Sequence, residues 1–479
     1  MSTHFSLFDW GLIVAFLAGY AYLGVRARSH SSSLDEFLVM GRRLGPWWGV
    51  ATLAASETGL ITLIYFAEEA YLSGFVAFIL AAVAALTMFA VGWTGLVIKR
   101  LRALEVRTVP EFMEQRFNAN IRSLAGLAMF IVGVLNMGIF LQGESAFLAV
   151  ILGLPESQVI WVMAVMLVVV VAYTMLGGMY SVVLTDVVQF VMIVVGMTVT
   201  TWFVVVHAGG WNGLVAAVAH SRGDAGFFPW RSPRFGLLFL IWTTLYYLSG
   251  WSTWQPVVAR VLSMKDVDLS LKLFRWSSLF MFMRAAFPMV WGLGALAILG
   301  PKVTSSLALP KMLVQIIPSG VIGLVTVGFI SASMSTYSSY LLAFSSILLQ
   351  DVIGPHTKKP WDNRHRILAM QAGTVLIAVF IFAWASLYRF PDSLFRFITL
   401  SGSLAYAATL STLVGGIYWK RTNVAGAFCA FVGSALPPIA AIVHTSIDPT
   451  WAGLLSFVLA PVGLLAGSLW PCVRRHQRA

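Results

Sequence analysis

The chain has 479 residues, of which 59% are hydrophobic and only 10% are charged. Soluble globular proteins carry about 25% charged residues, so this composition indicates a polytopic membrane protein. The net charge of +12 does not indicate nucleic-acid binding, because the basic residues lie in short stretches between apolar segments. Two cysteines, Cys429 and Cys472, and eight scattered histidines argue against a disulfide framework, a metal cluster or a thiol enzyme.

Thirteen apolar segments are long enough to cross a bilayer as helices, which takes about twenty residues. The first is not preceded by a basic run and contains Asp9, so it is not a typical signal peptide. The segments lie near residues 6–25, 46–70, 74–97, 122–152, 157–177, 181–207, 236–262, 275–300, 317–350, 367–388, 392–419, 424–445 and 450–472.

The connecting stretches predict the orientation in the membrane. Basic residues gather on one side, in 26–43, 99–122, 260–275, 358–366, 420–421 and 474–478. The positive-inside rule places that side in the cytoplasm, with the N-terminus outside and the C-terminus inside. The stretch 208–235, with three arginines, is a single exception on the opposite side.

Two of the apolar segments are interrupted by polar or helix-breaking residues. The interruptions are 54–62 (AASETGLIT) and 248–256 (LSGWSTWQP). A pair of broken helices in corresponding positions of two halves of a membrane protein indicates a binding site near the middle of the membrane. Unwound backbone there frees carbonyl groups that can bind a cation or line a cavity.

The segment 328–351 is apolar yet rich in hydroxyl groups. Further hydroxyls lie beside one helical face that is formed by residues at spacings of three and four: Ser331, Ser335, Ser338, Leu342 and Ser346. Hydroxyl and carbonyl oxygens suit a hard cation such as Na⁺. The alternative is that these small residues serve close helix packing.

Four runs resemble the sodium/solute symporter family, which includes proline, sugar and sialic-acid transporters. The run from Ala332 to Asp351, AxMSTxSxxLLxxSSxxxxD, is similar to the eighth core helix of that family. Residues 35–48 (DEFLVMGRRLGPWW) resemble the stretch leading into its first core helix. Residues 177–189 (GGMYSVVLTDVVQ) and 415–427 (GGIYWKRTNVAGA) resemble its turns between helices four and five and helices ten and eleven.

The resemblance implies an all-α polytopic membrane protein with about 13 transmembrane helices. Its fold would be the leucine-transporter-like five-plus-five inverted repeat, with broken first and sixth core helices. The implied parts are a peripheral helix in 1–43, a first repeat in 44–209, an outer loop in 210–235, a second repeat in 236–419, and two peripheral helices with a cytoplasmic tail in 420–479.

The resemblance also implies sodium sites. The common site would use backbone carbonyls at the first interruption together with the eighth core helix, from Ala55, Thr58, Ala332, Ser335 and Thr336. An additional site would use Asp186, Ser338 and Ser339, and two intact clusters predict two sodium ions per solute. The alternatives are a plain kink at the first interruption, a favourable position of Asp186 near a helix N-terminus, and a second ion that stays bound.

Residues at matching positions imply a solute site. They are Glu57, Gly59, Thr62, Tyr247, Trp251 and Arg284. The alternatives are that Glu57 tunes sodium affinity or takes up a proton, and that the two aromatic residues serve packing alone. Arg284 interrupts an apolar helix, and its alternative is to extend towards the cytoplasmic edge. Glu144 departs from the family pattern and has no assigned role.

These features predict Na⁺-coupled symport of a small polar organic solute by alternating access, in the cell membrane. The solute would be a sugar, sialic acid, amino acid or carboxylate; the surroundings would be membrane lipid, and neither nucleic acid nor an obligate protein partner is implied. Proton coupling, with Glu57, Asp186 or Glu144 titrating, is the alternative on the same fold. A non-transporting sensor is disfavoured by the short tail after Pro471, and an enzyme by the lack of paired catalytic groups.

Overall fold

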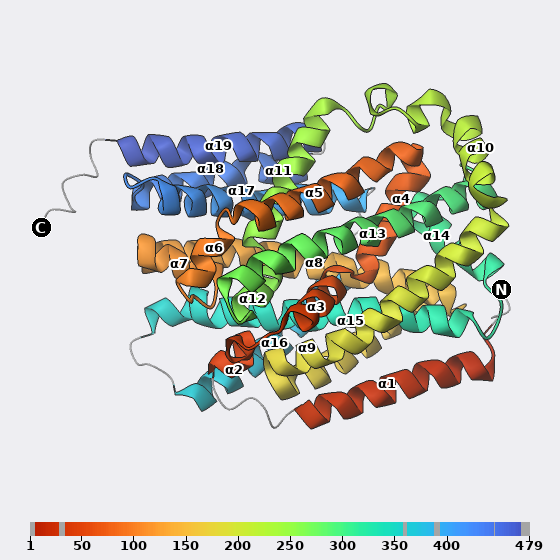
Figure 1. Cartoon of the computed structure of the whole chain (residues 1–479), viewed down its shortest axis with the longest axis horizontal. Helices are drawn as coiled ribbons and strands as arrows, with labels where there is room; N and C mark the ends of the chain where they lie inside the picture. Colours follow the sequence, from red (N-terminus) through yellow and green to blue (C-terminus); the bar gives the residue numbers. More distant parts are fainter. Residues whose placement is uncertain (1–4, 28–33, 358–361, 388–392, 445, 471–479) are drawn as a thin grey trace, which may run out of the picture.

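The computed structural model describes residues 5–27, 34–357, 362–387, 393–444 and 446–470. Across these ranges every regular element is a helix, and most long helices run roughly along the long axis of the molecule (Figure 1). The all-helical fold expected from the sequence is thereby confirmed. The predicted tail beyond residue 470 lies outside the described residues.

Each of the thirteen expected segments coincides with helical structure in its described part. Eight helical segments of the described chain are long and apolar enough to cross a membrane, and the full number of crossings stays a prediction. The helices are α1 (Leu7–Ala27), α2 (Leu34–Val39), α3 (Pro46–Glu57), α4 (Leu60–Ser73), α5 (Phe78–Thr94), α6 (Ile98–Ala103), α7 (Val109–Arg116), α8 (Ala119–Ile151), α9 (Val159–His207), α10 (Gly210–Arg222), α11 (Leu237–Thr253), α12 (Gln255–Ser263), α13 (Val267–Leu299), α14 (Ser305–Ile316), α15 (Ile322–Ser346), α16 (Asn363–Leu387), α17 (Leu394–Tyr418), α18 (Val424–Val443) and α19 (Pro449–Leu469).

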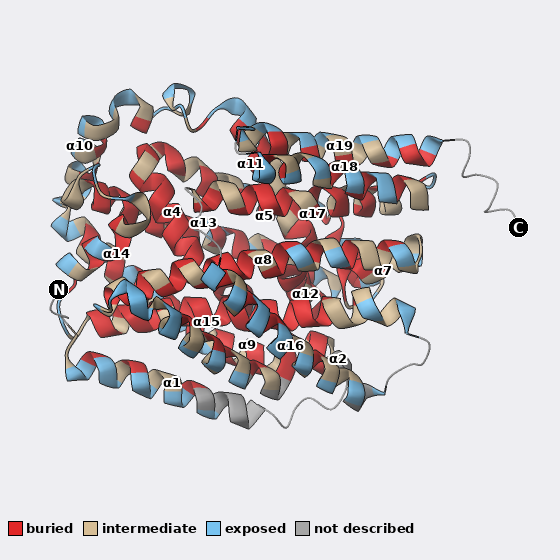
Figure 2. Ribbon diagram, turned by 180° about the vertical axis from the view of Figure 1, so that it is seen from behind, coloured by how far each residue is buried: buried red, intermediate tan, exposed pale blue. Residues whose placement is uncertain are grey.

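Apolar side chains cover the outer flanks of the bundle as well as its interior. Buried residues concentrate along the middle of the molecule, and exposed ones lie on the outer helices (Figure 2). Leu376 of α16, Leu436 of α18 and Val458 of α19 are each more than half exposed. Extensive exposed apolar surface suits contact with lipid, so the protein is a multi-pass membrane protein.

The two ends of the bundle differ in what they carry. The first residues of α1 and the last residues of α19 lie at opposite ends (Figure 1). The short helices α2, α6 and α7, with nearby basic residues such as Lys99 and Arg116, lie towards the end where α19 finishes, and α10 and α14 lie towards the other. This arrangement agrees with the expected orientation, in which the α19 end is cytoplasmic; the orientation itself stays a prediction.

The first expected interruption is a break between α3 and α4. Helix α3 ends at Glu57, and Thr58 leaves helical geometry with φ −102° and ψ 62°. Gly59 is extended, with φ −67° and ψ 153°, before α4 begins. The Thr58 hydroxyl donates to the Ala54 carbonyl over 2.6 Å. The break leaves carbonyls at the end of α3 and N–H groups at the start of α4 without helical partners, inside a buried region.

The second expected interruption is a break between α11 and α12. Helix α11 ends at Thr253, and Trp254 adopts φ −65° and ψ 116° before α12 begins at Gln255. Pro256 lies in the first turn of α12, where its missing N–H costs no helical hydrogen bond. Both interruptions predicted from the sequence are therefore confirmed.

The sequence separates two expected segments at 157–177 and 181–207, and the structure confirms a break between them at Gly178. Helix α9 spans Val159–His207 and changes direction at Gly178 alone, which has φ 54° and ψ −146°. A Cβ atom there would lie 2.5 Å from the ring of Phe37 in α2. Glycine is needed for the positive φ and for the close approach of α2. A single residue therefore makes the change of direction between the two expected segments.

Candidate functional site

Two hydroxyl side chains of α15 contact the end of α3 at the first break. Ser335 Oγ donates to the Ala55 carbonyl over 2.8 Å, and Thr336 Oγ1 donates to the Ser56 carbonyl over 3.0 Å. Each hydroxyl also lies 3.1 Å from the Ala332 carbonyl of its own helix. None of the five residues is more than 3% exposed. A buried cluster of neutral oxygen atoms thus joins α3 to α15.

This oxygen cluster contains four of the five residues predicted for the common sodium site, and the fifth is adjacent. Thr58 donates its main-chain N–H to the Ala55 carbonyl over 3.1 Å. Carbonyl and hydroxyl oxygens are the ligands a hard cation prefers, and a helix break supplies carbonyls that no helical hydrogen bond uses. The residues present therefore fit a sodium ion, and their coordination of it stays a prediction.

Gly59 allows α15 to approach the break. A Cβ atom on Gly59 would lie 2.8 Å from Thr336 Oγ1, a separation that real Cβ atoms essentially never show. The absence of a side chain therefore keeps the Thr336 hydroxyl against α3. Gly59 also lines a cavity beside the break.

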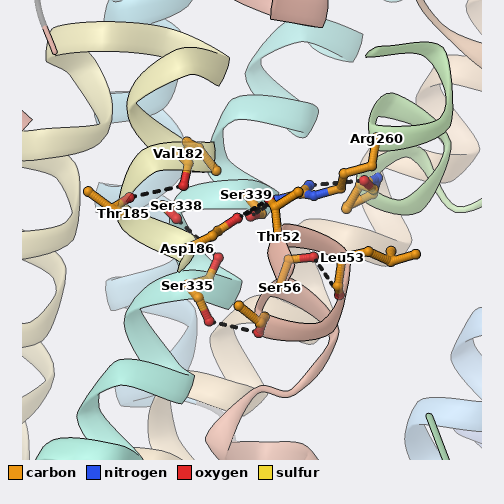
Figure 3. Close-up of polar contacts among 12 residues, drawn as sticks. Thr52, Leu53, Ser56, Val182, Thr185, Asp186, Arg260, Ser335, Ser338 and Ser339 are labelled. Carbon is orange, nitrogen blue, oxygen red and sulfur yellow. Dashed lines mark hydrogen bonds and ion pairs between the residues drawn. The ribbon is translucent and has the colours of Figure 1, made fainter. Parts of the chain in front are cut away.

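Asp186 of α9 lies where α3, α12 and α15 meet (Figure 3). Its Oδ2 accepts hydrogen bonds from the Thr52 hydroxyl and from Arg260 Nη2, the latter at 3.1 Å. The same Arg260 nitrogen donates to Ser339 Oγ. The Asp186 and Arg260 side chains are 0% and 1% exposed, and Asp186 Oδ1 has no hydrogen-bond partner.

The additional sodium site predicted at Asp186, Ser338 and Ser339 therefore has the Arg260 guanidinium between two of its residues. Ser338 instead donates to the Ser335 carbonyl over 3.0 Å, which links this region to the oxygen cluster. A sodium ion there would share the Asp186 carboxylate with Arg260 or displace it. The second ion stays a prediction, and Arg260 is its direct competitor.

The assignment of Arg260 to a basic loop is wrong. Arg260 lies in α12, is 1% exposed, and donates to the Pro256 carbonyl one turn earlier as well as to Asp186. A signal was present in the sequence, because the expected span 236–262 already contained this arginine. A cation inside an apolar span needs a buried partner, and Asp186 was the available carboxylate.

A cavity of about 80 Å³ lies beside the first break. Thr336 lines it, so one side chain belongs to both the oxygen cluster and the cavity. The structure brings the predicted solute residues together here, and their role as ligands stays a prediction. All six line the cavity: Glu57, Gly59, Thr62, Tyr247, Trp251 and Arg284.

Arg284 of α13 reaches the broken end of α3. Its Nη1 donates to the main-chain carbonyl of Glu57, and its guanidinium lies over the Trp251 ring, 5.4 Å from the centroid. A cation at a helix C-terminus stabilises the unpaired carbonyls there. Arg284 is 4% exposed, so its side chain does not extend to the membrane surface.

Sequence reasoning missed most of the aromatic wall of the cavity. Trp254, at the second break, packs edge-on against Tyr340 at 5.3 Å and Tyr406 at 5.6 Å between ring centroids. Its position inside the interruption 248–256 was a usable signal. The other rings come from several helices, and the hydrophobic periodicity of single helices does not predict which helices lie close together. The additional lining aromatics are Tyr65, Phe140, Tyr246, Trp254, Tyr340 and Tyr406.

Glu144 of α8 is buried next to the first break. Its Oε1 accepts the Ile61 main-chain N–H over 2.8 Å at the start of α4, and its Oε2 accepts from the Ser333 hydroxyl of α15. The carboxylate therefore satisfies an N–H without a helical partner and lies at the positive end of the α4 dipole. Both of these donors are neutral, and the two hydrogen bonds tie α8, α4 and α15 together.

Comparison with known sequences points to one family. The sequence profile of the sodium:solute symporter family matches residues 37–433. The sodium/glucose cotransporter of Vibrio parahaemolyticus is 25% identical over 460 aligned residues, covering 89% of this chain and 82% of the relative. The sodium/sialic acid symporter of Aliivibrio fischeri is 22% identical over 448 residues, covering 90% and 86%. These relatives are transporters and not enzymes.

Solved structures show the same fold. A Na⁺-coupled sialic acid symporter in a substrate-bound, outward-open state superposes with a TM-score of 0.82 at 18% identity, over 97% of this chain and 98% of the other. The nucleobase-cation-symport-1 transporter Mhp1 gives a TM-score of 0.56 at 13% identity, over 90% and 93%. With a family match that spans most of its length and this fold, the chain belongs to the sodium:solute symporter family.

Proposed function

We propose that the protein is a secondary active transporter that couples Na⁺ entry to uptake of a small polar organic solute by alternating access. Thr336 carries the argument, because its hydroxyl belongs to the oxygen cluster while its side chain lines the solute cavity. An ion bound at the cluster would alter the solute site through this shared residue, which gives the two ligands a coupling free energy. Membership of the family supports Na⁺ as the coupling ion.

Two sets of contacts on either side of the cavity are the candidate gates. Near the end of α4, Glu69 accepts hydrogen bonds from Arg234 at 2.9 Å and from Ser393 at 3.2 Å. On the α12 side, Gln255 donates to the Arg107 carbonyl over 3.2 Å and accepts the Val109 N–H over 3.1 Å. In the expected orientation the first set is external and the second cytoplasmic, and alternating access requires them to open in turn.

The two broken helices fall in the two proposed repeats. The break at Thr58–Gly59 lies in 44–209, and the break at Trp254 lies in 236–419. Residues from both breaks line the same cavity, as expected for a site between two repeats. The segments 1–43 and 420–479 then supply peripheral helices, and 210–235 supplies the outer loop.

Uptake by the purified protein in proteoliposomes tests this proposal. Solute should accumulate under an inward Na⁺ gradient and not under an equal K⁺ gradient, and Ser335→Ala should raise the Na⁺ concentration for half-maximal uptake. Ser331→Ala is the matched control, because Ser331 is buried one turn away and bonds only its own helix, at the Val327 carbonyl 2.7 Å away. Equal Na⁺ dependence of the two variants would contradict the ion site, and uptake driven equally by K⁺ would contradict sodium coupling.

Proton coupling on the same fold is the second candidate, and Glu144 is the observation that favours it. A buried carboxylate bonded to the first break by neutral donors is a group that a proton could neutralise. Uptake driven by an inward pH gradient in Na⁺-free medium, and lost in Glu144→Gln, would establish this candidate. If no uptake occurs under the pH gradient unless Na⁺ is present, proton coupling is excluded.

A further inference from the structure

The solute cavity contains two opposite charges that do not pair with each other. Glu57 is 7% exposed and Arg284 is 4% exposed, and both line the cavity. Among the described residues no cation lies within 4.0 Å of the Glu57 carboxylate, and its Oε1 has no hydrogen-bond partner. Arg284 bonds the main-chain carbonyl of Glu57 and not the carboxylate, and its Nε has no partner.

The Glu57 carboxylate occupies a position that favours a bound cation. Glu57 is the last residue of α3, so its negative charge lies at the partially negative end of that half-helix. Burial away from water adds to the free-energy cost of an unpaired carboxylate. Aromatic faces attract organic cations, and eight aromatic residues line the cavity around it.

Two contacts fix the orientation of the Arg284 guanidinium, which can bind an anionic group. The Glu57 carbonyl fixes one side of it, and the Trp251 ring lies against its face. Trp251 is itself held by a hydrogen bond from its Nε1 to the Ala84 carbonyl of α5, at 3.0 Å. A planar guanidinium with a fixed orientation is well suited to a carboxylate.

We infer that the solute is a small zwitterion, an amino acid or a betaine, with its ammonium group against Glu57 and its carboxylate against Arg284. This inference rests on the proposed transport function and names its substrate class. A zwitterion pairs both charges of the cavity, whereas a plain carboxylate leaves Glu57 unpaired, a plain amine leaves Arg284 unpaired, and a neutral sugar leaves both. The volume of about 80 Å³ also favours few heavy atoms, since pockets for drug-sized ligands are about 300–1,000 Å³.

A matched ligand series provides the first test. Thermal stabilisation of the purified protein in Na⁺ is measured with glycine, alanine, serine, proline, β-alanine, γ-aminobutyrate and glycine betaine. Propionate and ethylamine are the matched analogues of alanine that lack one charge, and glucose and myo-inositol are the neutral solutes. At least one zwitterion should stabilise the protein at a concentration about 10-fold or more below its single-charge analogues. Stabilisation by a sugar and by no zwitterion would overturn the inference.

Charge-removing variants provide the second test. Glu57→Gln should weaken binding of the preferred zwitterion about 10- to 100-fold and leave binding of its deaminated analogue unchanged. Arg284→Gln should weaken binding of the preferred zwitterion by a similar factor and leave binding of its decarboxylated analogue unchanged. Glu57→Asp and Arg284→Lys keep the charges and should keep the preference for a zwitterion, which also covers the case that Arg284→Gln fails to fold. Equal loss of the zwitterion and its deaminated analogue in Glu57→Gln would refute the pairing.

Two different results separate an error in the substrate class from an error in the proposed sodium coupling. If Na⁺ alone stabilises the protein and a sugar accumulates under a Na⁺ gradient, sodium symport stands and the zwitterion is refuted. If zwitterions bind with the stated charge dependence but uptake does not depend on the Na⁺ gradient, the substrate class stands and sodium coupling is refuted.

Discussion

Replacing Arg260 with glutamine removes the cation beside Asp186 and tests whether a second sodium ion can take its place. The guanidinium lies 3.1 Å from the carboxylate in a fully buried pair, so Arg260→Gln leaves Asp186 with the Thr52 hydroxyl. Removing one partner of a buried ion pair typically costs about 3–5 kcal/mol. We expect this loss of stability in K⁺ and a partial recovery in Na⁺, because an ion held by Asp186 and Ser339 would restore a positive charge.

Thermal unfolding in detergent, in Na⁺ and in K⁺ at equal ionic strength, measures both effects. The controls are Asp186→Asn, which removes the carboxylate, and the double variant, which removes both charges and should regain much of the stability lost in K⁺. Stability of Arg260→Gln equal to that of the parent in K⁺ would refute the energetic role of the ion pair. A Na⁺ response in Arg260→Gln no larger than in the double variant would refute a sodium site at Asp186.

The reversal potential of transport in proteoliposomes extends the same reasoning to stoichiometry. Two sodium ions per solute are expected if Na⁺ displaces Arg260 from Asp186 during the cycle. A ratio of one in the parent, unchanged in Asp186→Asn, would remove the second ion from transport and leave Arg260 as the permanent partner of this carboxylate.

Three further substitutions test the surroundings of the first break. Thr336→Ala should weaken apparent affinity for Na⁺ and for solute together by about 2- to 10-fold, whereas Thr326→Ala, whose hydroxyl bonds only its own helix, should leave both unchanged; separate effects on the two ligands would contradict the shared role. Gly59→Ala places a Cβ 2.8 Å from the Thr336 hydroxyl, so Na⁺ titration should show weakened binding, and wild-type affinity would mean that the approach of α15 does not matter. Glu144→Ala leaves the Ile61 N–H unsatisfied and should cost about 1–3 kcal/mol of stability, with a smaller loss in Glu144→Gln, which keeps an acceptor; equal melting temperatures would refute the capping role.

The sequence was most informative where function requires local irregularity. Both helix breaks were predicted within their residue ranges, because Gly59 and Pro256 disrupt apolar helices for reasons that act over a few residues. The hydroxyl face of α15 was visible for the same reason, since its spacing is a property of one helix. The resemblance to a family supplied what periodicity does not contain, namely that these two features contact each other.

Contacts between distant segments were the part that sequence reasoning could not supply. Arg260 was read as a cytoplasmic charge because its partner, Asp186, lies 74 positions away in the chain. The aromatic wall was missed because its rings come from several helices, each of which is individually typical of a membrane span. The boundary expected between the segments 157–177 and 181–207 is present, but it takes a single glycine, Gly178, because α2 packs directly against α9 there.

The burial of α15 on all sides has a consequence for how mutations along it will be tolerated. Within Ile322–Ser346, every residue except Leu324 and Ile330 is buried. Most membrane helices have a lipid-facing side on which substitutions are nearly neutral, so a saturation scan gives a signal with the helical period of 3.6 residues. Helix α15 has almost no such side, and its mutational profile should lack that period. Intolerance should instead follow side-chain volume along the whole helix, with additional peaks at the hydroxyl residues that contact α3, α8 and α12.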